Sequence, residues 1–400
     1  MQVPYFRPSM TDAEIQEVVA VLKSGWLTTG PMAKRFEQEF AAAVGASHAV
    51  AVNSATAALH LAVEAVGLRA GQAVLVPTLT FAATAEIVRY MGAFPVLVDC
   101  DPVTLNMDLA DAEAKLADLR AGRLPGSIDR DTSVVGIIPV HVGGLMMDIA
   151  AIDAFAKRHG IWVVEDAAHA FPSGWRSGAD QPWRRCGGGT ARITCFSFYA
   201  NKTITTGEGG MATTEDAGLA ERMRTMSLHG LSQDAWKRFS GGSWDYQIVA
   251  PGFKYNLTDV AAAIGVHQLA RAEDMRRRRE ALAHVYREGL AGLPTLELPP
   301  VPADRQLSWH LFPVRLTLGG LSRERDTFMG AMKERGVGTS VHWRPLHLHP
   351  YYSHGMGWRT DHLPAATRVW PRLVSLPLFP DMTPADSAYV IRAVRELSVP

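Results

Sequence analysis

Residues 133–166 read SVVGIIPVHVGGLMMDIAAIDAFAKRHGIWVVED, and they contain the unit that decides the fold. The segment opens with a short apolar run, SVVGIIPV, and closes with a second one, IWVVED. Between them, MDIAAIDAFAKRHG carries apolar residues at helical spacing and ends on Gly160. A strand, a helix and a strand at this spacing predict two parallel strands joined by a helix that covers the sheet.

The same alternation extends in both directions, from about residue 48 to residue 215. The apolar runs HAVAV, AVLV and FPVLVD precede the quoted segment, and ARITCFSF and GGMATT follow it. Ser54 and Asp108 stand where two of the intervening helices are expected to begin. We therefore predict an α/β fold in which residues 1–250 form a large domain with a mainly parallel sheet and an N-terminal arm.

The pattern changes after about residue 250. One long helical pattern covers residues 258–289, and a strand (HLFPVRL) and two helices (SRERDTFMGAMKERG and TPADSAYVIRAVREL) come later. These elements predict a small α/β domain over residues 251–400.

Composition excludes several classes of protein. The 400 residues are 47% hydrophobic and 20% charged, and 40 basic residues balance 40 acidic ones, so there is no charge excess for nucleic acid or an anionic membrane. Three Cys without a CxxC pair indicate neither a zinc cluster nor a disulfide framework. The first residues lack an apolar signal core, and no apolar stretch is long enough to span a membrane. We expect a soluble, cytoplasmic protein.

Two features point to a ligand site at the ends of the strands. Asp166 ends the apolar run VVED, and ligands of open α/β sheets bind in the crevice at the carboxyl ends of the strands. The alternative is that Asp166 only caps the next helix. Ser54 and Thr56 open a helix whose free N–H groups could hold a phosphate, and Ser197 ends a later strand.

Lys202 adds a reactive group to this set. It follows an apolar, aromatic run in FSFYANKTITTGEGGM (residues 196–211), and it is either a surface lysine or an amine with a lowered pKa. Phe81 begins a helix, where it packs in the core or covers a flat ring. A phosphate cradle, a carboxylate for a pyridinium nitrogen, a ring-covering aromatic and a lysine together describe a site for pyridoxal 5′-phosphate (PLP).

The chain resembles the DegT/DnrJ/EryC1/StrS family of sugar aminotransferases. The resemblance is carried by SATAALHLA, EDAAHA, FSFYANKTITTGEGGM and GFKYNLTDVAAAIGVHQL, together with GWLTTGP, IIPVHVGG, VHWRPLHLHPYY and SLPLFP, in the family's order. It implies PLP-dependent transferase fold type I, the architecture of aspartate aminotransferase.

The resemblance also implies roles for single residues. Lys202 forms the covalent C=N bond to PLP, Asp166 pairs with the pyridine nitrogen, and His169, where many relatives have Gln, lies near the ring. The remaining cofactor contacts are Ser54, Ala55, Thr56 and Ser197 at the phosphate, Phe81 on the ring, and Asn256, which reaches the phosphate of the neighbouring subunit. The site is therefore expected to be shared within a homodimer.

The expected reaction moves an amino group from L-glutamate to a keto-sugar nucleotide. Similarity of VAPGFKYNLTD and VHWRPLHLHPYY to C4-acting members favours C4 amination of a 4-keto-6-deoxy sugar over C3 amination. A keto-sugar dehydratase of this fold has histidine in place of Lys202, and a non-catalytic binding protein is expected to have lost Lys202 or Asp166. No metal site is expected.

Substrate contacts are less specific in the sequence. Candidates for the sugar or its diphosphate are His310, His342, His347, His349, Arg35, Arg224 and Lys237, and KRFSGGSWDYQ reads as a Gly-rich loop near the dimer interface.

Overall fold

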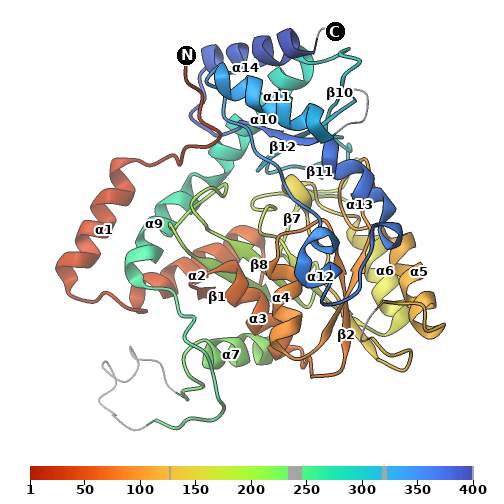
Figure 1. Ribbon diagram of the computed structural model, residues 1–400. Helices are drawn as coiled ribbons and strands as arrows, with labels where there is room; N and C mark the ends of the chain where they lie inside the picture. The colour runs from red at the N-terminus through yellow and green to blue at the C-terminus, as the bar shows by residue number, and fades with distance from the viewer. Residues whose placement is uncertain (126–127, 233–245, 318–321, 399–400) are drawn as a thin grey trace.

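The computed structural model describes residues 1–125, 128–232, 246–317 and 322–398 (Figure 1). A large body contains the main sheet and its helices. A smaller body lies above it in Figure 1, and both chain termini are at this upper end. KRFSGGSWDYQ falls mostly, and Lys237 entirely, outside the described residues.

Seven strands form the main sheet in the order β1-β9-β8-β5-β4-β2-β3. Strands β8, β5, β4, β2 and β3 are parallel to their neighbours in that run, and β9 is antiparallel to both β1 and β8. The predicted large, mainly parallel sheet is confirmed. The strands are β1 (His48–Val52), β2 (Ala73–Pro77), β3 (Phe94–Val98), β4 (Val134–Ile137), β5 (Trp162–Asp166), β8 (Ile193–Ser197) and β9 (Gly210–Thr214).

The quoted segment forms the predicted unit. Strand β4 leads through α6 (Ile149–His159) to β5, and β4 and β5 are adjacent and parallel. All five residues of β2 are buried, as expected for a parallel strand covered on both faces. The other helices of the large body are α1 (Asp12–Ser24), α2 (Pro31–Val44), α3 (Ala55–Ala65), α4 (Ala83–Tyr90), α5 (Leu109–Arg120) and α7 (Ala217–Met226).

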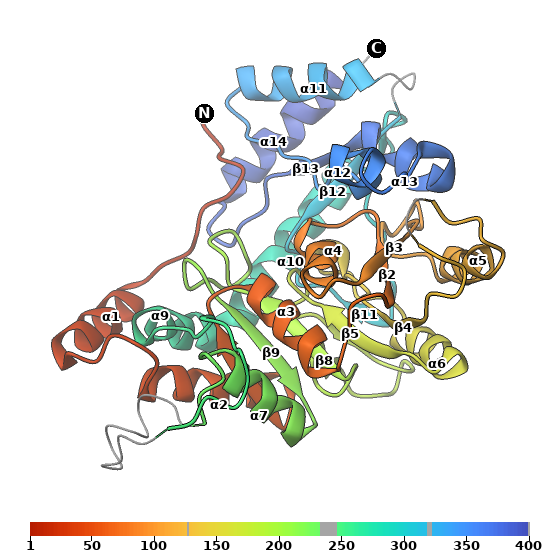
Figure 2. The same ribbon diagram turned by 60° about the horizontal axis from the view of Figure 1, so that its bottom comes forward.

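Helix α3 lies beside α4 and α7 and packs mainly on strands β9 and β8 (Figure 2). The predicted caps are present: Ser54 accepts the Ala57 N–H at 3.1 Å and Asp108 accepts the Ala110 N–H at 2.8 Å. Each cap satisfies a backbone donor that the helix leaves free. These caps fix where α3 and α5 begin.

The small body has its own core. An antiparallel sheet of β10 (Leu296–Glu297), β12 (Phe312–Leu316) and β13 (Leu373–Leu376) packs with α10 (Ala272–Gly289), α11 (Ser322–Glu334) and α14 (Pro384–Leu397). Val3, near the chain start, joins this core and bridges to Val337. The domain boundary near residue 250 stays a prediction; Met275 still belongs to the large core, and Ala283 belongs to the small one.

The long helix predicted over residues 258–289 is wrong in one respect, because it is two helices. Helix α9 (Asp259–Ala270) ends at Arg271, which has φ −104° and ψ 0°, and α10 starts at the next residue. Helix α9 packs on α1 and α2, so closely that a Cβ on Gly265 would lie 2.7 Å from the Phe36 ring. Helix α10 packs on α14 of the small body, so the chain changes direction between the two bodies.

Short elements complete the chain. Strands β6 (Gly174–Trp175), β7 (Arg184–Arg185) and β11 (Arg305–Gln306) form a third sheet. The short helices are η1 (Val142–Gly144), η2 (Leu346–Leu348), α12 (Pro350–Ser353), η3 (Thr360–His362), α13 (Pro364–Val369) and η4 (Trp370–Arg372). Within the described ranges, every helix is too short or too polar to cross a bilayer.

Candidate active site

Asp166 is the last residue of β5, at the edge where the parallel strands end. Its side chain is 5% exposed. Oδ1 accepts the Ala168 N–H at 3.1 Å, and Oδ2 accepts the Thr84 hydroxyl at 2.8 Å. Burial raises the pKa of Asp166, whereas these hydrogen bonds and the charge of Lys202 act to lower it. Two donors therefore hold the carboxylate, and its other lone pairs are available to a ligand.

Lys202 lies in the turn that follows β8, where its N–H donates to the Tyr199 carbonyl at 2.9 Å. Most of the Lys202 side chain is surrounded by protein, and the residue as a whole is half-buried. Burial lowers the pKa of Lys202 from 10.5 to about 8, although the negative charge of Asp166 opposes the shift. At pH 7.5 roughly a quarter of such amines are neutral, compared with about 0.1% of ordinary lysines. A neutral amine is the form that attacks a carbonyl carbon.

His169 belongs to a wall of rings beside these two residues. Its ring is stacked 4.9 Å from Trp343 and lies 4.2 Å from His310. Nδ1 of His169 accepts the Gly143 N–H at 3.3 Å, so the ring proton is on Nε2. Burial, and then nearby positive charge, lowers the pKa values of His169, His310 and His342, so all three imidazoles are neutral near pH 7.

The expected phosphate contacts come together at the start of α3. The Ser54 hydroxyl caps this helix, and the first N–H groups of the helix, on Ala55 and Thr56, point out of its end. Gly210 packs against this end, where a Cβ would lie 2.5 Å from the Ser54 carbonyl, and it pairs with Ser197 on β8. Ser197 therefore adjoins the helix start, as an anion site requires.

Phe81 and Asn256 are placed differently. Phe81 lies two residues before the first residue of α4, is 62% exposed, and its carbonyl accepts the Thr84 N–H at 3.3 Å. Asn256 donates to the Thr29 hydroxyl at 2.6 Å and bridges to Val52 on the edge strand β1. The structure does not group Asn256 with Lys202 of the same chain.

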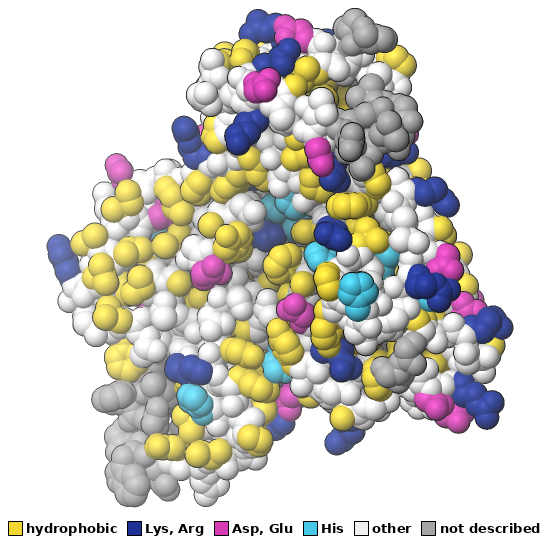
Figure 3. Space-filling view, in the orientation of Figure 1, with side chains coloured by type: hydrophobic (Ala, Val, Ile, Leu, Met, Phe, Trp, Pro, Cys, Tyr) yellow, Lys and Arg dark blue, Asp and Glu magenta, His cyan; other side chains and the backbone are white. Residues whose placement is uncertain are grey.

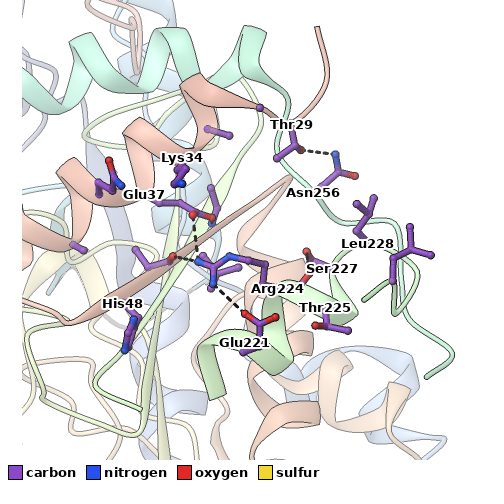
Figure 4. A pocket seen from close by; sticks show the side chains of 18 of the residues that line it. Thr29, Lys34, Glu37, His48, Glu221, Arg224, Thr225, Ser227, Leu228 and Asn256 are labelled. Atoms are coloured by element: carbon purple, nitrogen blue, oxygen red, sulfur yellow. Dashed lines mark hydrogen bonds and ion pairs between the residues drawn. The ribbon is translucent and has the colours of Figure 1, made fainter. Parts of the chain in front are cut away.

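Asn256 and Thr29 line a cavity of about 400 Å³ at the edge of the sheet (Figure 4). In the same cavity Arg224 donates to the Ala49 carbonyl at 3.1 Å and pairs with Glu37 at 3.3 Å. Glu37 in turn accepts the Ala51 N–H at 2.8 Å. Arg224, which is a candidate to bind a nucleotide diphosphate, thus covers the open edge of β1.

The other substrate candidates are dispersed. Arg35 pairs with Glu39 at 2.7 Å on the exposed side of α2. His347 is buried and contacts the Thr78 and Thr367 hydroxyls at 2.8 and 2.9 Å, whereas His349 contacts the Arg344 carbonyl. Of the seven candidates, His310 and His342 belong to the ring wall.

One buried trio in the described ranges has metal-ligand atoms close together. The ligand atoms of His141, Glu165 and Cys186 lie within 4.8 Å of one another. Nδ1 of His141 accepts the Met147 N–H at 3.2 Å, which places the proton on Nε2, 3.6 Å from Oε1 of Glu165. A protonated nitrogen is no metal ligand, so this geometry favours a histidine–glutamate contact over a metal centre.

Sequence reasoning missed Thr84, Trp343 and Gly143. Thr84 is 82 residues from the carboxylate it contacts, and Trp343 is brought to His169 by a return of the chain from the small body. The stretches that contain them, TLTFAAT and VHWRPLHLHPYY, were visible, but nothing in a single sequence gives side-chain partners across such separations.

The assembled residues fit PLP. An amine with a lowered pKa stands beside a buried carboxylate, and a helix start with an adjoining hydroxyl lies at the same strand ends. The imidazoles nearby are neutral and add no competing positive charge. These are the groups that an aldehyde, a pyridinium nitrogen and a phosphate need.

The chain is similar to known proteins over nearly its whole length. Residues 8–395 match the model of the DegT/DnrJ/EryC1/StrS aminotransferase family. The chain is 43% identical, over 99% of its length and 97% of the relative, to the spore coat polysaccharide biosynthesis protein SpsC of Bacillus subtilis. Spr1654 of Streptococcus pneumoniae, assigned as a sugar aminotransferase and solved in PMP and PLP forms, superposes in its PMP form with a TM-score of 0.88, at 30% identity over 99% of both chains. DesV of S. venezuelae superposes with a TM-score of 0.84, at 33% identity over 97% of this chain and 94% of its own.

Proposed function

Because the chain belongs to the DegT/DnrJ/EryC1/StrS aminotransferase family, we propose that it is a PLP-dependent enzyme that transfers the amino group of L-glutamate to a keto-sugar nucleotide. Fold type I and a sugar-aminotransferase activity agree with the neighbouring structures. The preferred acceptor in this proposal is a 4-keto-6-deoxy sugar that is aminated at C4.

One observation carries the proposal: Lys202, with a pKa of about 8, lies within range of the charge of the buried Asp166 at the ends of the parallel strands. A dehydratase of the same fold would have histidine at position 202. A binding protein that had lost the chemistry would not need either residue. Both residues are present, and each changes the ionisation of the other.

When bound, PLP supplies an aldehyde that takes up the amino group and a ring that accepts the electron pair released at the amino-bearing carbon. Lys202 would hold the cofactor covalently through Nζ. As a free amine with a lowered pKa, Nζ of Lys202 would accept the proton of the amino-bearing carbon and donate it again. Asp166 keeps the ring nitrogen protonated through a charge-assisted hydrogen bond. Glutamate leaves as 2-oxoglutarate, and the keto sugar collects the nitrogen on the same site, which gives ping-pong kinetics.

The proposal includes a homodimer with shared sites. Ile15, Val19 and Leu22 are 58%, 41% and 53% exposed, and their spacing places them along one face of α1. Figure 3 shows hydrophobic side chains gathered over this helix, at the left of the view. A surface of this kind supports contact with a second copy. In that dimer Asn256 would reach the phosphate of the partner's cofactor.

The proposal places the enzyme in the cytoplasm. Cys100, Cys186 and Cys195 are all unpaired, buried thiols. Free thiols are usual where the surroundings are reducing.

The test is a panel of 3-keto and 4-keto sugars on dTDP, UDP or GDP, each incubated with the enzyme, PLP and L-glutamate. Formation of 2-oxoglutarate with one nucleotide sugar, and NMR of the product, identify the acceptor and the position of the new amino group. Lys202→Ala is the control and should form none. Loss of water from the sugar without 2-oxoglutarate would instead indicate a dehydratase, and binding without any turnover a non-catalytic protein.

A further inference from the structure

A chain of two buried hydroxyl groups ends on Asp166. The Thr80 and Thr84 hydroxyl oxygens are 2.8 Å apart, and the Thr84 hydroxyl is 2.8 Å from Oδ2 of Asp166. Thr80 is 2% exposed and Thr84 is fully buried. Neither threonine belongs to the set of residues that the family resemblance assigns to the cofactor.

The chain has a direction. An ionised carboxylate only accepts, and Oδ2 of Asp166 is closer to the Thr84 hydroxyl (2.8 Å) than the Phe81 carbonyl is (3.3 Å), so the single hydroxyl proton of Thr84 is donated to Asp166. The Thr84 oxygen then accepts from Thr80, because it has no second proton to give. Aligned donors of this kind polarise one another and strengthen the last bond, the one to the carboxylate.

The position of Thr84 on α4 ties two parts of the cofactor site together. Thr84 lies in the first turn of α4, and both its N–H and its hydroxyl lie 3.3 Å from the Phe81 carbonyl. The same residue therefore contacts the carboxylate expected at the ring nitrogen and the backbone of the aromatic expected on the ring face. Movement of this turn would displace both.

We propose that Thr84, supported by Thr80, is a positioning residue that fixes the direction of the Asp166 carboxylate and holds its negative charge against the pyridine nitrogen of PLP. The inference rests on the proposed function for its cofactor, and it assigns a role that is independent of which sugar is aminated. Thr84 itself touches neither PLP nor substrate.

A neutral donor is useful because the charge of Lys202, which helps to keep Asp166 ionised, changes during the reaction. Burial pushes Asp166 toward its uncharged form, and Lys202 is one of the groups that counteract this. The charge on Nζ changes when Lys202 releases the cofactor and carries a proton. The Thr84 hydroxyl and the Ala168 N–H stay in place throughout, so they keep Asp166 ionised while Lys202 changes its state.

The test uses Thr84→Val, which keeps the side-chain shape and removes the hydroxyl, and Thr84→Ser, which restores it. Each holoenzyme is reconstituted with PLP labelled with ¹⁵N in the ring, and the nitrogen resonance is recorded from pH 6 to 9. Without the donor, Asp166 becomes the stronger base, so in Thr84→Val the resonance should move toward that of an unprotonated pyridine. Thr84→Ser should return it to the wild-type position.

Kinetics provide the second readout. Removing a hydrogen bond to a charged group predicts a loss of roughly 10- to 100-fold in kcat for the half-reaction with glutamate, with KM changed less than about threefold. Thr80→Val should shift both readouts in the same direction and by less. If Thr84→Val does not fold, Thr80→Val carries the test alone.

Thr213→Val is the matched control. Thr213 is 1% exposed and donates to the Gly187 carbonyl at 3.1 Å, so the variant loses a buried hydroxyl bond elsewhere in the sheet. It should leave the ring-nitrogen resonance and kcat unchanged. An unchanged resonance in Thr84→Val, or an equal shift in Thr213→Val, overturns the inference. If the wild type binds PLP but aminates no sugar of the panel, the resonance test still decides the role of Thr84; if it binds no PLP, the proposed function fails first.

Discussion

The pKa of Lys202 can be measured directly on the apoprotein. Burial places it at about 8, so the reactivity of this amine should rise about tenfold per pH unit up to pH 7 and level off above pH 8. At pH 7.5 its neutral fraction, roughly a quarter, exceeds that of a lysine with a pKa of 10.5 by about two orders of magnitude. This larger neutral fraction is the increase in the reactivity of Lys202 that results from the fold.

Asp166→Asn is the informative perturbation. The carboxylate charge raises the pKa of Lys202 against the effect of burial, so removing that charge while keeping the shape should move the midpoint below 8. A simple loss of structure would instead move it up, toward the value of about 10.4 for a free lysine. The sign of the shift therefore separates the electrostatic effect from unfolding.

The assay is competitive labelling with trace acetic anhydride from pH 6 to 11, followed by digestion and mass spectrometry of each lysine peptide. Lys157 on α6 is the reference in the same digest, because its side chain is 76% exposed. A Lys202 midpoint near 10.4 in the wild type, or a midpoint that rises in Asp166→Asn, would refute the reasoning.

Three further changes have defined outcomes. Asp166→Asn should lower kcat by at least about 100-fold and weaken PLP binding far less, because the partner of the ring nitrogen is lost. Steady-state rates and a PLP titration measure the two effects. A near-normal kcat would show that Asp166 has no part in the mechanism. Glu14, 2% exposed, has its pKa lowered to about 2 because hydrogen bonds from Thr11 and Gln268 outweigh the effect of burial. The stability that ionised Glu14 contributes is complete above pH 4.5 and is lost as the pH falls through 2. Glu14→Gln should therefore lower the free energy of unfolding in urea by about 3 kcal/mol at pH 7 and by roughly half of that at pH 3. An equal loss at both pH values contradicts the assignment. Mixing Lys202→Ala with Asn256→Ala should restore about a quarter of wild-type activity, since half of the dimers would hold one intact site; no recovery after subunit exchange verified by mass excludes sharing through Asn256.

The sequence was most informative where local pattern determines structure. Alternating apolar runs and helical patterns identified the strands and helices of the sheet, and Ser54 and Asp108 cap their helices as predicted. The break at Arg271 was not predictable, because LARAED contains neither Gly nor Pro. The helix ends there because α9 and α10 pack on different bodies, and Arg271 bonds to Glu14 at 2.6 Å across that junction. The antiparallel direction of β9 was likewise set by pairing over long range.

For the site, residue types at strand ends identified Asp166 and Lys202 as candidates, but their electrostatic relation depends on the fold. Strand β5 and the turn after β8 come from different parts of the chain, and their pairing places the two groups within range of each other's charge. Thr84, whose hydroxyl lowers the pKa of Asp166, lies 82 residues before it, and His310, whose pKa Lys202 helps to lower, comes from a segment of the small body's sequence. A single sequence contains no record of such contacts.

The distribution of charge explains why these neighbours are neutral. Burial raises the pKa of Asp166 and lowers the pKa of Lys202, because it favours the uncharged form of each group. The charge of each residue acts against this effect on the other. A protonated histidine at His169 or His310 would stabilise Asp166 but would also disfavour a protonated ring nitrogen and a protonated Lys202. Their pKa values are lowered, so both imidazoles provide polarity without charge. Lys202, with a pKa of about 8, is therefore the group whose charge can change near neutral pH, and hydroxyl and amide donors help to keep Asp166 ionised.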